Sequence, residues 1–146
     1  MVIDVMELKR NGSLRGEFCF KFCADPALLN IPSVKFDGQA EVSGEAEVSG
    51  SDVYIDAMLK YALVGECSKC LAPARADVIY PFSAKFSLFP EEDEYLYKSG
   101  KVDLTAAVNE NIVLSEPFAI YCKPDCKGLC PTCGADLNYC DCGHKI

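Results

Sequence analysis

Cysteine is the residue of this 146-residue chain whose number and spacing most clearly indicate chemistry, with ten copies. Eight of them form four close pairs: Cys67 with Cys70, Cys122 with Cys126, Cys130 with Cys133, and Cys140 with Cys142. A Cys-x-x-Cys turn folds back on itself, so that two sulfurs can bind one zinc ion at about 2.3 Å each. Gly134 follows the Cys130–Cys133 turn and can adopt the positive φ that such a turn favours. The spacing therefore predicts metal sites.

The beginning of the chain bears on whether these cysteines form disulfides instead. Its first residues include an acid at Asp4, with no basic stretch and no sustained apolar run, so neither a signal peptide nor a membrane span is predicted. We therefore expect a cytoplasmic protein. Disulfides are rare in a reducing cytosol, and thiolate ligation of a metal is the expected role of the paired cysteines.

Eight paired cysteines suffice for two closed sites of four thiolates each. We expect the first site to be Cys67, Cys70, Cys122 and Cys126, and the second to be Cys130, Cys133, Cys140 and Cys142. The first site would attach the C-terminal tail to the rest of the protein. A single residue separates Cys140 from Cys142, which makes joint ligation of one ion harder, so His144, the only histidine, is the alternative ligand.

The two remaining cysteines, Cys19 and Cys23, are expected to have no role in metal binding. They lie four positions apart in a predicted strand, a separation of about 13 Å. This distance is too long for both to bind one ion, and they are predicted to be packing residues of the core.

Most of the chain preceding the tail alternates in the manner of β-strands. Phe18, Phe20 and Phe22 alternate with polar residues and cysteine within a predicted strand over Gly16–Cys23. Apolar residues then occupy even positions between Val34 and Val48, and two longer strands are predicted over Asp52–Val64 and Ala74–Leu88, with the first Cys-x-x-Cys pair at the turn between them. We expect a mainly β (α+β) fold, with an antiparallel barrel-like or strongly twisted sheet.

One helix and a zinc-ribbon-like tail complete the expected fold. Asp103 is a favourable N-cap, and Leu104, Val108 and Ile112 recur on one helical stripe that ends before Pro117. The segment that follows is too short and too rich in cysteine and glycine to form a hydrophobic core, so it needs a metal to fold. The expected organisation is a β-rich domain over residues 1–120 and a cysteine-rich zinc-binding tail over residues 121–146 packed on it.

Charge and motif content restrict the possible functions. The net charge is −8, and residues 1–120 carry 11 Lys and Arg against 19 Asp and Glu. Phosphate backbones are bound by clustered Lys and Arg, of which this chain has no run, so a basic protein is the favoured partner. With one histidine, no phosphate-binding loop and no dinucleotide-binding motif, the chain is expected to be non-catalytic.

Three motifs together resemble the YceD-like large ribosomal RNA subunit accumulation proteins, in the branch with a cysteine-rich C-terminal tail. They are Cys67-x-x-Cys70-Leu71, the segment from Glu110 to Pro117, and the segment from Cys122 to Asn138. The resemblance implies a bacterial or plastid protein needed for normal levels of large-subunit ribosomal RNA, through its synthesis, processing or stability. Other branches keep the first pair and a cysteine near position 126 while lacking the second tail cluster, which fits a division into two sites.

The resulting hypothesis is a protein with two zinc ions that acts through a ribosomal protein or a pre-ribosomal particle. One alternative is a metal-dependent RNA-binding module in which Lys123, Lys127 and Lys145 contact phosphate. Another is a thiol redox or iron-binding protein, since thiolates also bind iron. Metal content and an absorption spectrum distinguish the last alternative, because zinc is colourless and thiolate-bound iron is not.

Overall fold

The computed structural model describes residues 1–12 and 14–143 of the chain. Its strands are β1 (Val2–Asp4), β2 (Arg15–Phe22), β3 (Val34–Phe36), β4 (Ala40–Ser49), β5 (Asp52–Glu66), β6 (Pro73–Ser87), β7 (Tyr95–Leu96) and β8 (Lys101–Asp103). Its helices are α1 (Val5–Arg10), the 3-10 turn η1 (Pro26–Leu28) and α2 (Thr105–Ser115). The fold is mainly β, as the sequence predicted, with more helical segments than the one expected.

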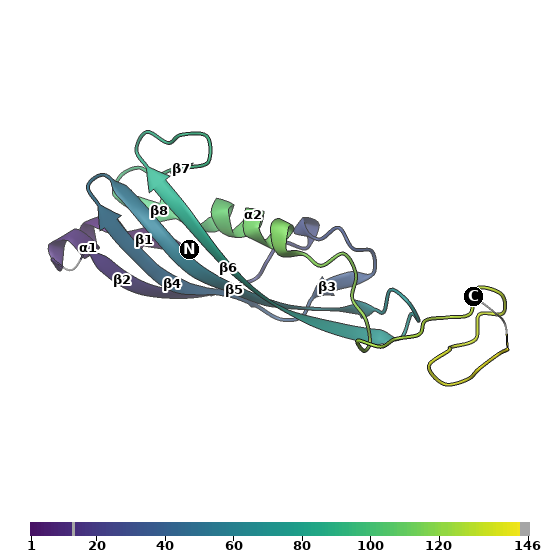
Figure 1. Ribbon diagram of the computed structural model, residues 1–146. Helices are drawn as coiled ribbons and strands as arrows, with labels where there is room; N and C mark the ends of the chain where they lie inside the picture. Colours follow the sequence, from purple (N-terminus) through teal and green to yellow (C-terminus); the bar gives the residue numbers. More distant parts are fainter. Residues whose placement is uncertain (13, 144–146) are drawn as a thin grey trace.

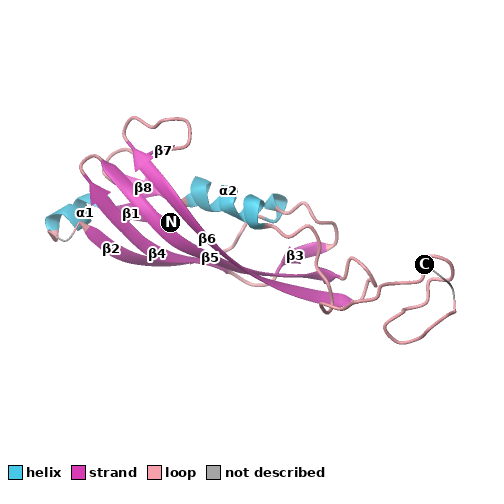
Figure 2. Ribbon diagram, in the orientation of Figure 1, coloured by secondary structure: helices cyan, strands magenta, loops and turns pink. Residues whose placement is uncertain are grey.

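One long twisted sheet organises the molecule, in the order β2-β4-β5-β6-β7 (Figures 1 and 2). The strands from β2 to β6 pair antiparallel, and β3 also pairs antiparallel with the end of β5, whereas β7 joins β6 in parallel. Within the described residues the sheet stays open, so the barrel-like alternative was wrong and the twisted sheet describes the fold. A small separate sheet pairs β1 with β8.

The inner face of the sheet forms the core, and it follows the alternation in the sequence. Ala40, Val42, Ala46 and Val48 of β4 are buried. Next to them lie the buried residues of β5, Val53, Ile55, Ala57, Leu59, Tyr61 and Leu63. Period-two burial on one face is typical of a sheet with one solvated side. The predicted one-sided burial is therefore confirmed, but the single strand expected between Val34 and Val48 is divided into β3 and β4, which both pair with β5.

Helix α2 packs on this inner face. Its predicted stripe is confirmed, since Leu104, Val108 and Ile112 are fully buried. The hydroxyl of Tyr61 on β5 lies 2.8 Å from Oγ of Ser115 at the helix end. The N-cap prediction was wrong: Leu104 occupies that position, and Asp103 instead accepts hydrogen bonds from the backbone N–H and hydroxyl of Thr105.

Cys19 and Cys23 are exposed, so their prediction as core packing residues was wrong. The three phenylalanines of β2 pack against the core, and alternation therefore directs the odd-numbered Cys19 to the solvated face. There its thiol donates a hydrogen bond to Oε1 of Glu41 at 3.5 Å. Partial desolvation, followed by this hydrogen bond, raises the pKa of the Cys19 thiol.

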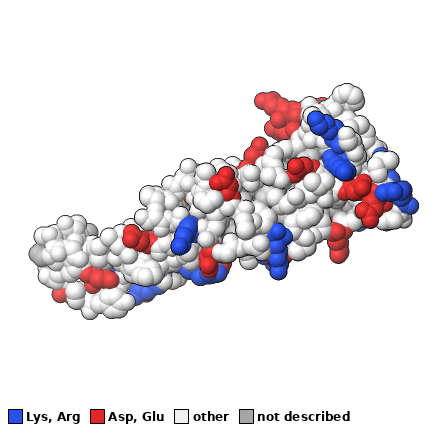
Figure 3. Space-filling model, turned by 180° about the vertical axis from the view of Figure 1, so that it is seen from behind, with Lys and Arg blue, Asp and Glu red and all other residues white. Residues whose placement is uncertain are grey.

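The tail extends beyond the end of the β5–β6 hairpin that lies farthest from α1 (Figure 1). From the opposite side, acidic and basic side chains are intermixed at the broad end of the molecule and along the rest of this face (Figure 3). Within the described ranges, no helix is both long and apolar enough to cross a membrane.

Gly44 allows β4 to approach β5 closely, and its substitution provides a test of the sheet. A Cβ at this position would lie 2.0 Å from the carbonyl oxygen of Asp56, a backbone atom that cannot move away. We expect Gly44→Ala to lower the free energy of unfolding by about 2–3 kcal/mol, measured by urea denaturation.

Gly16→Ala is the matched control, because a Cβ there meets only the flexible side-chain tip of Leu8. Its expected cost is below about 1 kcal/mol. Equal losses for the two variants would show that the close approach at Gly44 does not limit the packing of the sheet.

Candidate metal centres

The tip of the β5–β6 hairpin is a tight turn, called here the first cysteine turn (Cys67–Ala72). The N–H of Cys67 donates to the carbonyl of Ala72 at 2.7 Å, and the N–H of Leu71 donates to the carbonyl of Cys67 at 3.0 Å. Leu71 has a φ of +65°, a value that is unfavourable for a residue with a side chain. These bonds hold Cys67 and Cys70 on the same side of the turn.

A second cysteine turn (Cys130–Ala135) in the tail repeats this arrangement. The N–H of Cys130 donates to the carbonyl of Ala135 at 2.8 Å, and the N–H of Gly134 donates to the carbonyl of Cys130 at 2.9 Å. Gly134 has a φ of +76° at the position that Leu71 occupies in the first turn, as the sequence predicted for this glycine. Both predicted Cys-x-x-Cys turns therefore share one backbone geometry.

Backbone hydrogen bonds attach the tail to the first cysteine turn. The N–H of Ser68 donates to the carbonyl of Ile120 at 2.9 Å, and the N–H of Leu129 donates to the carbonyl of Lys69 at 3.2 Å. Nζ of Lys69 lies 3.4 Å from the carbonyl of Cys126 and 5.2 Å from the centre of the Tyr121 ring. The segment between Ile120 and Leu129 is thereby held against the hairpin tip.

This attachment brings four thiols together, called here the first cluster (Cys67, Cys70, Cys122 and Cys126). Their sulfurs all lie within 4.8 Å of one another. The Sγ atoms of Cys67 and Cys126 are 3.6 Å apart, and those of Cys70 and Cys122 are 3.5 Å apart. These distances are far longer than a disulfide bond of about 2.05 Å. They match the sulfur–sulfur distance of about 3.8 Å in a tetrahedral zinc site, so the four residues fit a metal ion.

The pKa values within the first cluster are split. Burial opposes ionisation of Cys67, but backbone hydrogen bonds to its sulfur, from Cys70 first, outweigh burial and lower its pKa to about 6. The side-chain amide of Asn138 is the main cause of the lowered pKa of Cys126. The hydrogen bond with Cys70, followed by burial, raises the pKa of Cys122 to about 12. A cation bound among these sulfurs would favour the thiolate form of all four.

A second cluster in the tail contains three thiols, those of Cys130, Cys133 and Cys142, also within 4.8 Å of one another. Backbone N–H groups of Cys133 and Thr132 lower the pKa of Cys130 to about 6. Cys140, the fourth predicted ligand, lies outside this group, and its thiol is 3.5 Å from the carbonyl of Asp136. The alternative ligand His144 lies outside the described residues.

Asn138 contacts residues on both sides of the second cysteine turn. The sequence analysis did not identify it as a functional residue. Its Nδ2 lies 3.4 Å from Sγ of Cys126, and its Oδ1 accepts a hydrogen bond from the N–H of Lys127 at 2.9 Å. The carboxylate of Asp136 accepts hydrogen bonds from both the backbone and the side-chain N–H of Asn138. The Asp-x-Asn spacing, typical of side-chain-bonded turns, was the available signal.

Comparisons with known proteins give the chain its relatives. The family model described as "Large ribosomal RNA subunit accumulation protein YceD" matches residues 55–146, which include both clusters. An uncharacterized protein of Mycobacterium tuberculosis (strain H37Rv) is 28% identical over 147 residues, covering 94% of this chain and 70% of the relative. The uncharacterized protein YlbN of Bacillus subtilis is 28% identical over 105 residues, covering 65% of this chain and 59% of the relative. No solved structure matches the chain significantly.

The two clusters predict the metal content of the protein. We expect the purified chain to hold about two zinc ions, measured by mass spectrometry of the metal, and Cys67→Ala to remove about one of them. The exposed Cys19 serves as the control, since Cys19→Ala leaves both clusters intact. Protein that contains no metal and keeps protected tail amides in hydrogen exchange would contradict both sites.

The contact of Asn138 with Cys126 predicts that this amide supports the first site. Asn138→Asp keeps the oxygen that accepts from Lys127 but places a negative charge beside the thiolate. We expect the zinc affinity of the first site to fall by about 10- to 100-fold, measured by competition with a chromophoric chelator. Asn109→Asp makes the same change on α2 and should leave the affinity unchanged. An unaltered affinity in Asn138→Asp would mean that the amide does not stabilise bound metal.

Proposed function

This chain belongs to the YceD family of large ribosomal RNA subunit accumulation proteins, and from that membership we propose that it is a non-catalytic zinc protein that supports the accumulation of large-subunit ribosomal RNA. The proposed role is in synthesis, processing or stability of this RNA during ribosome assembly. Zinc would hold the tail on the twisted sheet, and the protein would act through a ribosomal protein or a pre-ribosomal particle.

The convergence of four thiols in the first cluster carries the proposal of a structural metal. Four thiolates fill a tetrahedral coordination shell, whereas catalytic zinc keeps one position open for water or substrate. Cys67, Cys70 and Cys126 are also buried, which limits access to the metal. A closed and mostly buried site supports a structural role rather than catalysis.

The charge of the chain favours a basic protein as the partner. Zinc with four thiolates at the first cluster would add a charge of about −2 to the net charge of −8, and zinc with the three thiolates of the second cluster would add about −1. RNA binding draws on clustered Lys and Arg. Lys123 and Lys127 of the tail are exposed, but Asp125 lies between them in the sequence. Ribosomal proteins carry a positive charge and therefore complement this acidic chain better than RNA does.

The proposal predicts a loss of large-subunit RNA when the first site is broken. In a bacterium that lacks its own YceD-family gene, we expect this chain to restore the ratio of large- to small-subunit ribosomal RNA, measured by quantitative electrophoresis. Cys70→Ser should fail to restore it, because one ligand of the first cluster is lost. Cys23→Ser changes an exposed thiol outside both clusters and should restore the ratio fully.

Two results would contradict the proposal. Full activity of Cys70→Ser at a normal protein level would show that RNA accumulation does not need metal at the first site. Tight binding of naked large-subunit RNA at physiological salt, lost on charge reversal of Lys123 and Lys127, would favour the RNA-binding alternative.

A further inference from the structure

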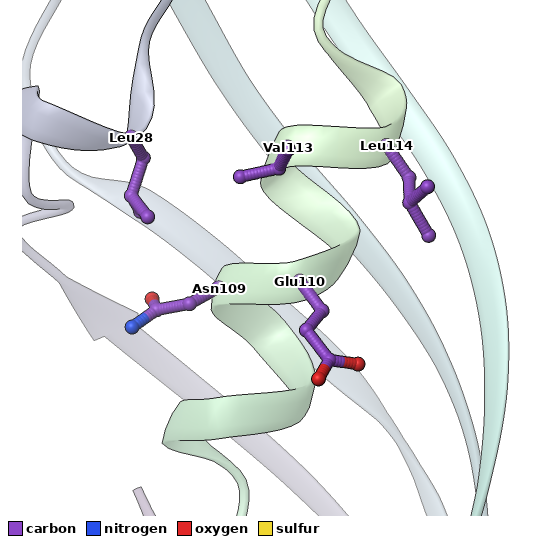
Figure 4. Close-up of a pocket in the computed structure, with 5 residues that line it drawn as sticks. All are labelled: Leu28, Asn109, Glu110, Val113 and Leu114. Atoms are coloured by element: carbon purple, nitrogen blue, oxygen red, sulfur yellow. The ribbon is translucent and has the colours of Figure 1, made fainter. Parts of the chain in front are cut away.

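A groove runs along the solvent side of α2, and neither the core nor the cysteine clusters account for it. Its first part is a hollow of about 410 Å³ between α2 and η1, lined by Leu28, Asn109, Glu110, Val113 and Leu114 (Figure 4). Val113 also borders an adjoining hollow of about 300 Å³ that continues past Glu116 to Phe118. We call these two hollows together the α2 groove.

The groove exposes large apolar side chains to solvent. Val113 is 44% exposed, Leu114 is 71% exposed and Phe118 is fully exposed. Val113 and Leu114 lie outside the buried stripe of α2 that packs on the core, and Phe118 follows the end of the helix. Val113 borders both hollows, with Leu114 in the lining of one and Phe118 in that of the other, and exposed apolar side chains beside a hollow are typical of an interaction site.

The two segments that form the groove walls carry only negative charges. Residues 28–32 and 109–118, which supply the lining of both hollows, contain Glu110 and Glu116 and no Lys or Arg. Neutral groups hold these two carboxylates in place: the Tyr95 hydroxyl donates to Glu110, and the backbone N–H groups of Asn30 and Ile31 donate to Glu116. Among the described residues, no salt bridge includes either carboxylate. Their charge is therefore available to a cationic partner.

We propose that the α2 groove binds a basic amphipathic helix of a partner protein. The apolar side of such a helix would cover Val113, Leu114 and Phe118, and its Lys and Arg residues would lie beside Glu110 and Glu116. Recognition of an amphipathic helix by an apolar groove is a common mode of protein binding. The acidic walls repel nucleic acid and anionic lipid, and a second copy of this chain, with a net charge of −8, is a poor match.

A designed peptide tests this surface on the intact, metal-loaded chain. The probe is a fluorescent amphipathic helix of about 18 residues with leucine on one side and lysine on the other, and a scrambled peptide of the same composition is its control. We expect micromolar binding by fluorescence anisotropy and no binding of the scrambled peptide. Leu114→Ser should weaken binding about tenfold. Glu110→Gln, which can keep the Tyr95 contact, should reduce the salt dependence.

The control variant is Ile79→Ser, which changes a residue that is 63% exposed on β6. It should bind the peptide as the unchanged chain does. Equal binding by Leu114→Ser and Ile79→Ser would overturn the proposal, as would a dimer in sedimentation that Leu114→Ser disrupts, since a second copy would then occupy the groove. The test does not depend on the role in ribosomal RNA, so its failure would leave the proposed function of the metal sites standing.

Discussion

The convergence of four sulfurs at the first cluster is the interaction on which the placement of the tail against the sheet depends. Its ligands come from the tip of the β5–β6 hairpin and from a tail segment more than fifty residues later in the chain. The tail has almost no apolar side chains of its own to bury, so hydrogen bonds and shared ligands must hold it in place. The sheet in turn needs no metal for its core, which lies elsewhere along β4, β5 and α2. Stability in this protein is therefore divided between a hydrophobic region and a region suited to metal.

The long strands and the helix could be predicted because each follows one strong period. Alternation identified β2, β4, β5 and β6, and the stripe Leu104–Ile112 identified α2. Sheet closure could not be predicted, because it depends on strand curvature and on which strands become edges, and periodicity carries neither. The exposure of Cys19 was also missed, although the inward placement of the neighbouring phenylalanines should have placed it outside. Residue type was given more weight than alternation there.

The number and pairing of the cysteines predicted which thiols of the first cluster lie together, because a Cys-x-x-Cys pair supplies only two of four ligands and needs a second pair. It could not predict the surroundings of those thiols. The side chains of Asn138 and Lys69 reach Cys126 only because the tail folds back on the hairpin tip. Leu71 has a positive φ that its side chain disfavours. The groove along α2 was missed because the periodicity of the helix indicates only the residues that it buries.

The position of Asn138 has a consequence for how the two clusters fill with metal. This residue follows the second cysteine turn in the chain, yet its amide contacts a sulfur of the first cluster. If metal binding at the second cluster orders Asn138, the first cluster no longer bears the free-energy cost of that ordering when it binds its own ion. Thermodynamic reciprocity requires that binding at the first cluster favour binding at the second by the same amount. Loading should therefore be cooperative, with few molecules half-filled when metal is scarce. When metal is scarce, partly filled molecules would then be rarer than two independent sites would give.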